Sequence, residues 1–136
     1  MQRIYIDGSC LNNPGPGSYA IIQLDEFNNE KIFTNVFEHT TNNRMELVAF
    51  IHSLQLVEEK TSIFTDSTYV FMGYNNWLKK WKITNWNNGK ISNIDLWQKV
   101  IHDDLVSLFW VKAHSNNYYN NKVDKIARSL LTNNFF

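Results

Sequence analysis

The order of hydrophobic patterns along this chain of 136 residues limits the folds that it can adopt. Three segments with strand-like spacing come first, and strands and helices alternate after them. The predicted strands cover residues 3–7, 18–24, 31–37, 63–65 and 108–111. The predicted helices cover about 43–59, 67–75, 96–101 and 120–131.

This order predicts an α/β fold, in which helices flank a mixed sheet. The polar residues at 25–29 indicate an antiparallel hairpin between the second and third strands, and we expect the strands that helices separate to have parallel neighbours. A length of 136 residues suits a single domain, and the 43% of hydrophobic residues supply its core.

The composition argues against several classes of protein. No window resembles a signal peptide, and no apolar run approaches the roughly 20 residues that a membrane helix needs. The single cysteine, Cys10, excludes an internal disulfide and a cysteine-rich zinc site. We therefore expect a cytoplasmic protein with no membrane association. The sequence indicates no obligate protein partner, and we expect a monomer.

The net charge of zero is unusual for a protein that binds nucleic acid, since such domains are commonly basic. One segment departs from this balance. Between Trp77 and Lys90 the chain has lysines and no acid; the lysines are Lys79, Lys80, Lys82 and Lys90. Asparagine is also abundant, with sixteen of nineteen residues in Asn-Asn pairs, and we assign these to loops and caps, where Asn tolerates left-handed backbone.

Four acids stand at the predicted ends of strands and helices: Asp7, Glu46, Asp66 and Asp124. Each has an ordinary structural interpretation. Asp7 suits a turn after a strand, and Glu46 has the capping-box spacing from Asn43. Asp66 can cap the following helix, and Asp124 suits a first helical turn.

Taken together, the acids favour a metal site. If the strands before Asp7 and Asp66 are neighbours, both carboxylates emerge at the same sheet edge, where ligands of α/β proteins bind. Glu46 and Asp124 begin helices that can point at this edge. Four carboxylates without a Cys or His cluster suit a hard cation such as Mg²⁺, and a divalent ion would relieve their repulsion.

Several motifs, in this order, resemble ribonuclease H, type 1, from about Tyr5 to Ala127. The run at 40–47 is the most specific of them. They are Asp7-Gly8-Ser9, Asn13-Pro14-Gly15-Pro16-Gly17, Thr40-Thr41-Asn42-Asn43-Arg44-Met45-Glu46-Leu47, Thr65-Asp66-Ser67-Thr68-Tyr69-Val70, Trp77 to Trp97, and Trp110-Val111-Lys112-Ala113-His114, with Asp124 ten residues after the histidine.

The resemblance implies a five-stranded mixed sheet and an endonuclease that cuts the RNA strand of RNA–DNA hybrids. The metal ligands would be Asp7, Glu46, Asp66 and Asp124, holding two Mg²⁺ ions, with Mn²⁺ as a substitute. Products would carry 5′-phosphate and 3′-hydroxyl ends. His114 would assist proton transfer or product release, because histidine side chains in general can gain and lose a proton near neutral pH.

The resemblance also implies a substrate surface. Cys10, Asn13, Asn42 and Asn43 would line the minor groove of the hybrid, where the 2′-hydroxyl distinguishes RNA from DNA. Thr41 and Asn93 match a pocket for a DNA phosphate, and Trp77 matches an aromatic contact to a deoxyribose. Residues 77–90 resemble a basic protrusion, called the handle here, whose Lys79, Lys80, Lys82 and Lys90 would contact phosphates.

Within the handle, Trp81 and Trp86 have an equally good interpretation as packing residues. Trp97 and Trp110 are expected in the core. Some positions depart from the family pattern, notably Thr68, Asn121 and the Tyr118-Tyr119 loop, and these affect the expected turnover rate rather than the ligands.

Three other functions compete with the hybrid nuclease. A hybrid-binding protein without catalysis has no use for four clustered acids. A scaffolding α/β domain leaves the order of the motifs unexplained. Another nuclease or polynucleotidyl transferase of the same fold is disfavoured by the Asn-rich groove and the handle, and a domain excised from a polyprotein stays an alternative.

Overall fold

The computed structural model describes residues 1–135, and its centre is one five-stranded sheet in the order β3-β2-β1-β4-β5. β1 and β2 pair antiparallel, as do β2 and β3, whereas β4 runs parallel to both β1 and β5. The mixed sheet predicted from the sequence is therefore confirmed. The strands are β1 (Gln2–Cys10), β2 (Gly15–Leu24), β3 (Glu30–Thr40), β4 (Thr61–Thr65) and β5 (Val106–Trp110).

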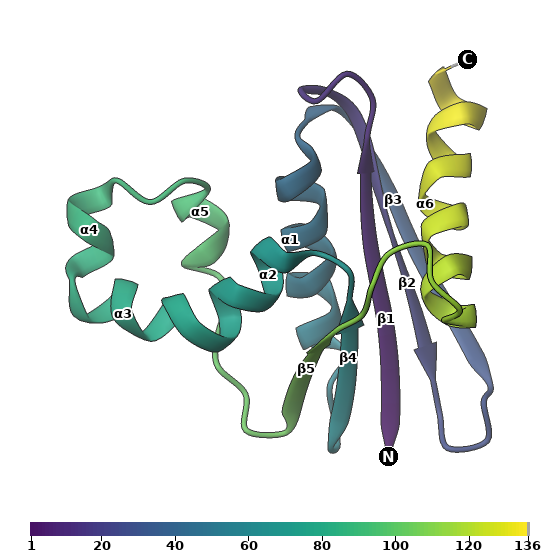
Figure 1. The fold of residues 1–136 in the computed structure, drawn as a ribbon, viewed down its shortest axis with the longest axis horizontal. Helices are drawn as coiled ribbons and strands as arrows, with labels where there is room; N and C mark the ends of the chain where they lie inside the picture. Colours follow the sequence, from purple (N-terminus) through teal and green to yellow (C-terminus); the bar gives the residue numbers. More distant parts are fainter. Residues whose placement is uncertain (136) are drawn as a thin grey trace.

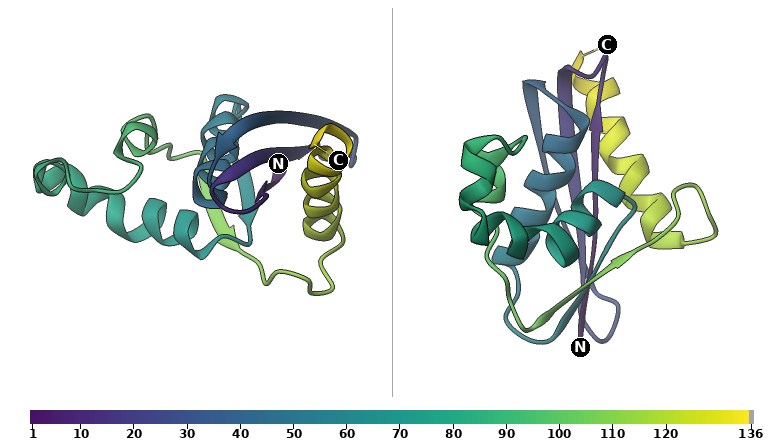
Figure 2. Two further views of the ribbon diagram at one scale, coloured as in Figure 1. Left: turned by 90° about the horizontal axis from the view of Figure 1, so that it is seen from above. Right: turned by 60° about the vertical axis from the view of Figure 1, so that its left-hand side comes forward.

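Helices cover the two faces of the sheet unequally (Figures 1 and 2). α1 packs on one face and α6 on the other, while α3 and α4, which lie between β4 and β5 in the chain, extend away from the sheet. The helical elements are α1 (Asn42–Gln55), α2 (Thr68–Met72), the π-helical turn η1 (Gly73–Trp77), α3 (Leu78–Ile83), α4 (Asn85–Gly89), α5 (Ile94–Trp97) and α6 (Tyr118–Phe135).

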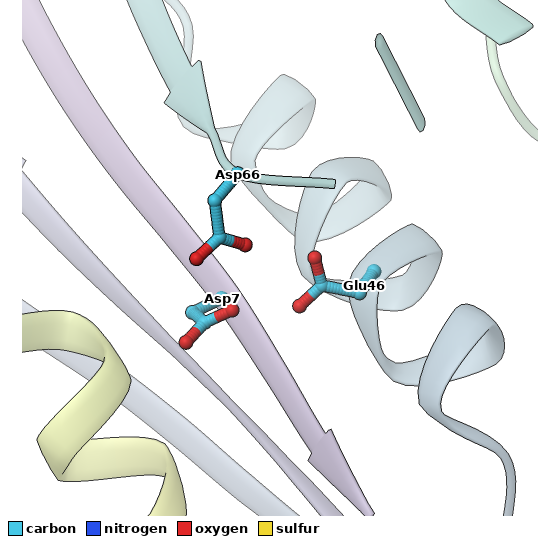
Figure 3. A group of neighbouring side chains, drawn as sticks. All are labelled: Asp7, Glu46 and Asp66. Carbon is cyan, nitrogen blue, oxygen red and sulfur yellow. The ribbon is translucent and has the colours of Figure 1, made fainter. Parts of the chain in front are cut away.

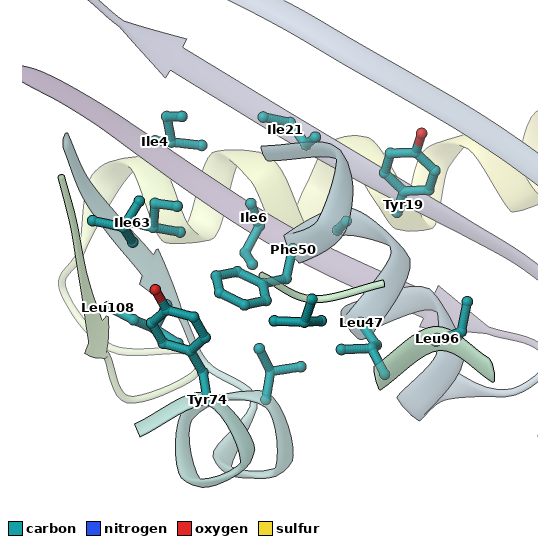
Figure 4. Close-up of a cluster of buried hydrophobic side chains, with 14 of the residues drawn as sticks. Ile4, Ile6, Tyr19, Ile21, Leu47, Phe50, Ile63, Tyr74, Leu96 and Leu108 are labelled. Carbon is teal, nitrogen blue, oxygen red and sulfur yellow. The ribbon is translucent and has the colours of Figure 1, made fainter. Parts of the chain in front are cut away.

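The larger core lies between the sheet and α1 (Figure 4). Successive side chains of a strand point to opposite faces, so Ile4 and Ile6 meet Leu47 and Phe50 on this side. Tyr5 points the other way and joins the smaller core beneath α6. This alternation fixes which face of the sheet each polar residue of β1 occupies.

Two predicted helices are longer than the structure has them. α1 ends at Gln55 instead of 59, because the chain must turn to place Thr61 beside Gln2 at the start of β4. α5 ends at Trp97 instead of 101, and Ile101, at the end of the predicted helix, is 74% exposed. In α6 the deeply buried residue near the C-terminal end is Leu131.

Asparagine supplies most of the left-handed backbone. Among the described residues, eight positions other than glycine have positive φ, and six of them are Asn: Asn12, Asn28, Asn85, Asn87, Asn88 and Asn93. Five consecutive residues with positive φ, 85–89, make up α4 in the handle. The assignment of Asn pairs to loops is correct for several pairs, although others begin or lie within helices. Within residues 1–135, no helix has the length and apolar character to span a membrane.

Candidate active site

Asp7 and Asp66 come from adjacent parallel strands at matching positions. β1 and β4 pair from Gln2–Thr61 to Tyr5–Phe64, and continuing this register places Asp7 opposite Asp66. β4 ends at Thr65, one residue before Asp66. β1 continues to Cys10 because its other edge pairs with β2, where Asp7 lies opposite Ala20. Asp7 therefore lies inside a strand, and its interpretation as a turn residue is wrong.

Glu46 reaches the sheet across Gly8. A Cβ on Gly8 would lie only 2.5 Å from the backbone nitrogen of Glu46, so the glycine is what lets α1 lie against β1. The Gly8 N–H donates to Oε1 of Glu46. The capping-box interpretation is wrong, because the cap of α1 is Thr41, whose Oγ1 accepts from Arg44 N. Glu46 instead sits in the second turn, with 3% of its surface exposed.

The backbone of Asp66 is bound by Trp110, and its carboxylate points into the site. The cap of α2 is Ser67, which accepts from Val70 N, so Asp66 is not the cap. The Trp110 indole N–H donates to the main-chain oxygen of Asp66 at 3.1 Å. This bond keeps Trp110 at the surface, 44% exposed, and corrects its assignment to the core.

The three carboxylates converge (Figure 3). Asp7, Glu46 and Asp66 each offer an oxygen within 4.8 Å of the others, and we call these residues the carboxylate cluster. Asp124 lines the same cavity of about 320 Å³ without belonging to this tightest group. It sits in the second turn of α6, not the first, and pairs with Arg128 at 2.9 Å.

Burial and mutual repulsion favour the protonated forms of these acids. Desolvation, followed by the charge of Glu46, raises the pKa of Asp7 far above its ordinary value. Desolvation likewise raises the pKa of Glu46 and of Asp66. A bound divalent cation would reverse this preference, since it favours ionised carboxylates.

Asn120 is a polar residue of the site that the sequence did not single out. It is 1% exposed, and its Nδ2 lies 3.5 Å from Oδ2 of Asp66. Its Oδ1 is buried without a partner among the described residues. The available signal was its position one helical turn before Asp124, on the face of α6 that meets the sheet.

His114 is near the carboxylates but not among them. It lies in the loop after β5, exposed and with a φ of 53°. Its charge, when protonated, acts to lower the pKa of Asp66, although desolvation outweighs this effect. It does not line the cavity of the carboxylate cluster.

The residues predicted to line the minor groove lie around the start of α1. Asn42 and Asn43 line the carboxylate cavity, as does Thr68. Asn13 Oδ1 accepts from Asn42 N at 2.9 Å, which links the loop after β1 to this helix. Cys10 ends β1 nearby, with its thiol 3.5 Å from Thr40 O. The structure thus brings this set together beside the acids.

The handle stands apart from the sheet (Figure 2). Its four lysines, Lys79, Lys80, Lys82 and Lys90, are exposed, and none forms an ion pair within residues 1–135. Trp81 packs against Trp86 and against the buried Trp97, with ring centroids 6.3 and 5.2 Å apart. Trp77 remains 37% exposed.

Comparison with curated proteins identifies close relatives over nearly the whole chain. Ribonuclease H from Ehrlichia ruminantium (strain Gardel) is 40% identical over 134 residues, which cover 93% of this chain and 91% of the relative. Ribonuclease H from Orientia tsutsugamushi (strain Boryong) is 44% identical over 133 residues, covering 92% and 79%.

Solved structures share the fold. LC9-RNase H1, a type 1 RNase H with the type 2 active-site motif, superposes with a TM-score of 0.82 at 25% identity, covering 97% of this chain and 72% of that one. LC11-RNase H1, solved in complex with an RNA/DNA hybrid, has a TM-score of 0.64 at 19% identity and covers 95% of each chain. The family model for RNase H matches residues 2–132, and the chain therefore belongs to the ribonuclease H family.

Proposed function

We propose that this protein is a Mg²⁺-dependent endonuclease that hydrolyses the RNA strand of RNA–DNA hybrids. The observation that carries the proposal is the convergence of three acids from β1, α1 and the end of β4, two of them buried and one partly buried, with ligand oxygens within 4.8 Å of one another. Membership of the ribonuclease H family supplies the substrate class, and one structural neighbour was solved with an RNA/DNA hybrid.

The donor set fits a hard divalent cation. Every ligand atom offered is a carboxylate oxygen, and within residues 1–135 no Cys or His joins the group. Asp7, Glu46 and Asp66 would hold Mg²⁺ directly, and Asp124, which lines the same cavity, would complete the set for a second ion. Bound ions would activate a water molecule and stabilise charge on the scissile phosphate.

The chain's own residues would prepare this site before substrate arrives. Gly8 N–H holds the Glu46 carboxylate, and Trp110 and Asn120 fix Asp66 from two sides. The exposed His114 is free to move a proton at the departing oxygen, which would leave 5′-phosphate and 3′-hydroxyl ends. Asn13, Asn42 and Asn43 would read 2′-hydroxyls, because an amide both donates and accepts.

The direct test compares four labelled duplexes: RNA–DNA hybrid, double-stranded RNA, double-stranded DNA, and a hybrid with a 2′-deoxy linkage at the cleavage position. We expect cleavage of the unmodified hybrid alone, with Mg²⁺ or Mn²⁺ and not in excess chelator. Mapping the product ends distinguishes 5′-phosphate from 3′-phosphate chemistry. Equal cleavage of double-stranded RNA, or undiminished cleavage in chelator, contradicts the proposal.

A hybrid-binding protein without catalysis is the alternative from another class. It would bind the hybrid and leave it intact under all metal conditions. The same assay separates the two functions if binding is measured beside cleavage. The clustering of acids favours the enzyme, because carboxylates without a cation beside a polyanionic ligand would not help simple binding.

A further inference from the structure

Arg44 joins the start of α1 to the start of α5 across 51 positions of the chain. Its Nη1 and Nη2 donate to Oδ1 and Oδ2 of Asp95 at 3.0 and 2.7 Å, in a two-pronged arrangement. Nη1 also donates to Oδ1 of Asn93 at 3.2 Å. One planar guanidinium thus fixes the position of two side chains on another element.

The side chain of Asn93 is held from its other end as well. Its Nδ2 donates to the Tyr69 hydroxyl at 3.1 Å, and that hydroxyl also accepts from the Trp97 indole N–H at 2.8 Å. The backbone of Asn93 is left-handed, with a φ of 58°. The Asn93 amide has only one possible orientation, because its Oδ1 accepts from Arg44 and its Nδ2 donates to Tyr69. The second hydrogen on Nδ2 is left for a ligand.

The support behind Asn93 is rigid. Trp97 is fully buried and stacks edge-on against Tyr69 and Trp81, with ring centroids 5.6 and 5.2 Å apart. The ring lies so close to Gly73 that a Cβ there would overlap it. Asn93 is therefore placed by a packed wall on one side and by Arg44 on the other.

Arg44 is also tied to Thr41. Its backbone nitrogen donates to Thr41 Oγ1 at 3.2 Å, in the turn that presents Asn42 and Asn43 to the carboxylate cavity. Thr41 and Asn93 are far apart in sequence, yet both connect to this one residue. Loss of the guanidinium would leave α1 and α5 without their direct polar link among the described residues.

We infer that Arg44 is a positioning residue for hybrid binding, which sets the distance and orientation between Thr41 and Asn93, the two side chains that the family resemblance implies for a DNA phosphate. The inference rests on the proposed function. Arg44 would do so without contacting the substrate, because Asp95 already occupies both prongs of its guanidinium.

The charges of the pair make the inference testable. Arg44 holds the pKa of Asp95 down, at about 2, so both groups are ionised at neutral pH and cancel each other. A positioning role through neutral Thr41 and Asn93 predicts lower affinity with no change in the number of counterions released. A direct phosphate contact by Arg44 predicts a flatter salt dependence, by about 0.9 in the logarithmic slope.

The experiment uses the double variant Arg44→Gln/Asp95→Asn, which preserves net charge. Binding of a labelled RNA–DNA hybrid is measured in chelator at several salt concentrations, and kcat and KM are measured with Mg²⁺. We expect Kd and KM to rise about 5- to 10-fold, as the loss of one or two hydrogen bonds would give, with kcat within about twofold and the salt slope unchanged. Unchanged Kd and KM, or a flattened slope, overturns the inference.

Two further variants guard against simpler explanations. Glu30→Gln breaks a comparable pair, Lys122 to Glu30 at 2.8 Å, on the opposite side of the sheet, and should leave Kd unchanged. Arg44→Lys keeps the charge but not the fork, and should bind as weakly as the double variant. Full affinity in Arg44→Lys would show that charge alone matters. Thermal unfolding verifies folding, and cleavage by the wild type separates failure of this inference from failure of the proposed function.

Discussion

The carboxylate cluster and the handle differ in how the fold holds them. The cluster gathers acids from β1, α1 and the end of β4, and two of the three are almost fully buried. The handle presents four lysines that are exposed and unpaired within residues 1–135. One region concentrates like charges at a cost in stability, and the other spreads them in solvent, where repulsion is screened.

This difference predicts different consequences of mutation. The three carboxylates lie within 4.8 Å of one another and would hold a cation together, so replacing any one of them should reduce turnover. An exposed lysine has a flexible stem and a charge that acts over several ångströms, so replacing it should weaken binding and spare turnover. The variants below can break this division.

Asp7→Asn should have the largest effect. The variant keeps the size of the side chain but removes a ligand charge at the centre of the cluster, and we expect kcat to fall more than about 10³-fold, or about 4 kcal/mol of barrier. Single-turnover cleavage with saturating enzyme measures this without interference from binding. Retention of more than about a tenth of wild-type activity, worth about 1.4 kcal/mol, means that Asp7 is not a ligand.

Glu46→Gln should reduce turnover strongly, though less than Asp7→Asn, because an amide oxygen at this position still accepts from Gly8 N. We expect a fall of about 10²-fold in kcat, or about 2.7 kcal/mol of barrier. The control is the melting temperature, which should not fall. A lower melting temperature with normal turnover would return Glu46 to a purely structural role.

Much of the fold was predictable because the strands follow their hydrophobic pattern. Residues Ile4 to Asp7 of β1 are buried without interruption, as the apolar run predicts for a strand covered on both faces, and the three strands at the start form the antiparallel part of the sheet. The ends of elements were less predictable. Asp7 looked like the end of a strand because polar and small residues follow it, but pairing with β2 carries β1 on to Cys10. Strand pairing is a tertiary property that local sequence does not encode.

The acids were identifiable by position and by resemblance, but their supports were not. Nothing in the sequence indicates that Gly8 opens the path for Glu46, or that Trp110 bonds to the backbone of Asp66. Its apolar neighbours in the sequence suggested a core position for Trp110. The indole N–H instead donates to the backbone of Asp66, and the ring stays partly exposed. Asn120 was missed because a buried amide beside an acid has no sequence pattern of its own.

Replacing the handle lysines should give a smaller effect on a different measurement. We expect Lys79, Lys80, Lys82 and Lys90, all changed to Gln, to weaken hybrid binding and flatten its logarithmic salt slope by about 2 to 3, with little change in kcat. The matched control changes four exposed lysines elsewhere, Lys31, Lys60, Lys99 and Lys125. Equal effects in both variants would mean that the lysines act only through the net charge of the protein. No effect in either variant would mean that the handle is a solvated surface without contact to the hybrid.

The smallest effect concerns stability without metal. The pKa values of Asp7 and Glu46 are raised, that of Glu46 to about 8 from 4.5, first by burial and then by their neighbours. Between pH 4.5 and about 8, the native state therefore binds more protons than the unfolded state. The stability that the protonated acids contribute is present at low pH and is lost as the pH rises. In chelator, the melting temperature of the wild type should therefore fall relative to Asp7→Asn between pH 5 and 8, by about 4 °C for each kcal/mol.

Saturating Mg²⁺ should remove this difference, because the cation favours the ionised carboxylates of the native state. The comparison with Asp7→Asn is essential, since burial lowers the pKa of His52, and this residue therefore contributes a pH dependence of opposite sign in both proteins. Parallel melting curves for the two proteins across the pH range in chelator would contradict the idea that the cluster stores repulsion. The fold would then have to compensate the repulsion among the carboxylates without a cation. In that case the carboxylate cluster would destabilise the protein no more than the handle does.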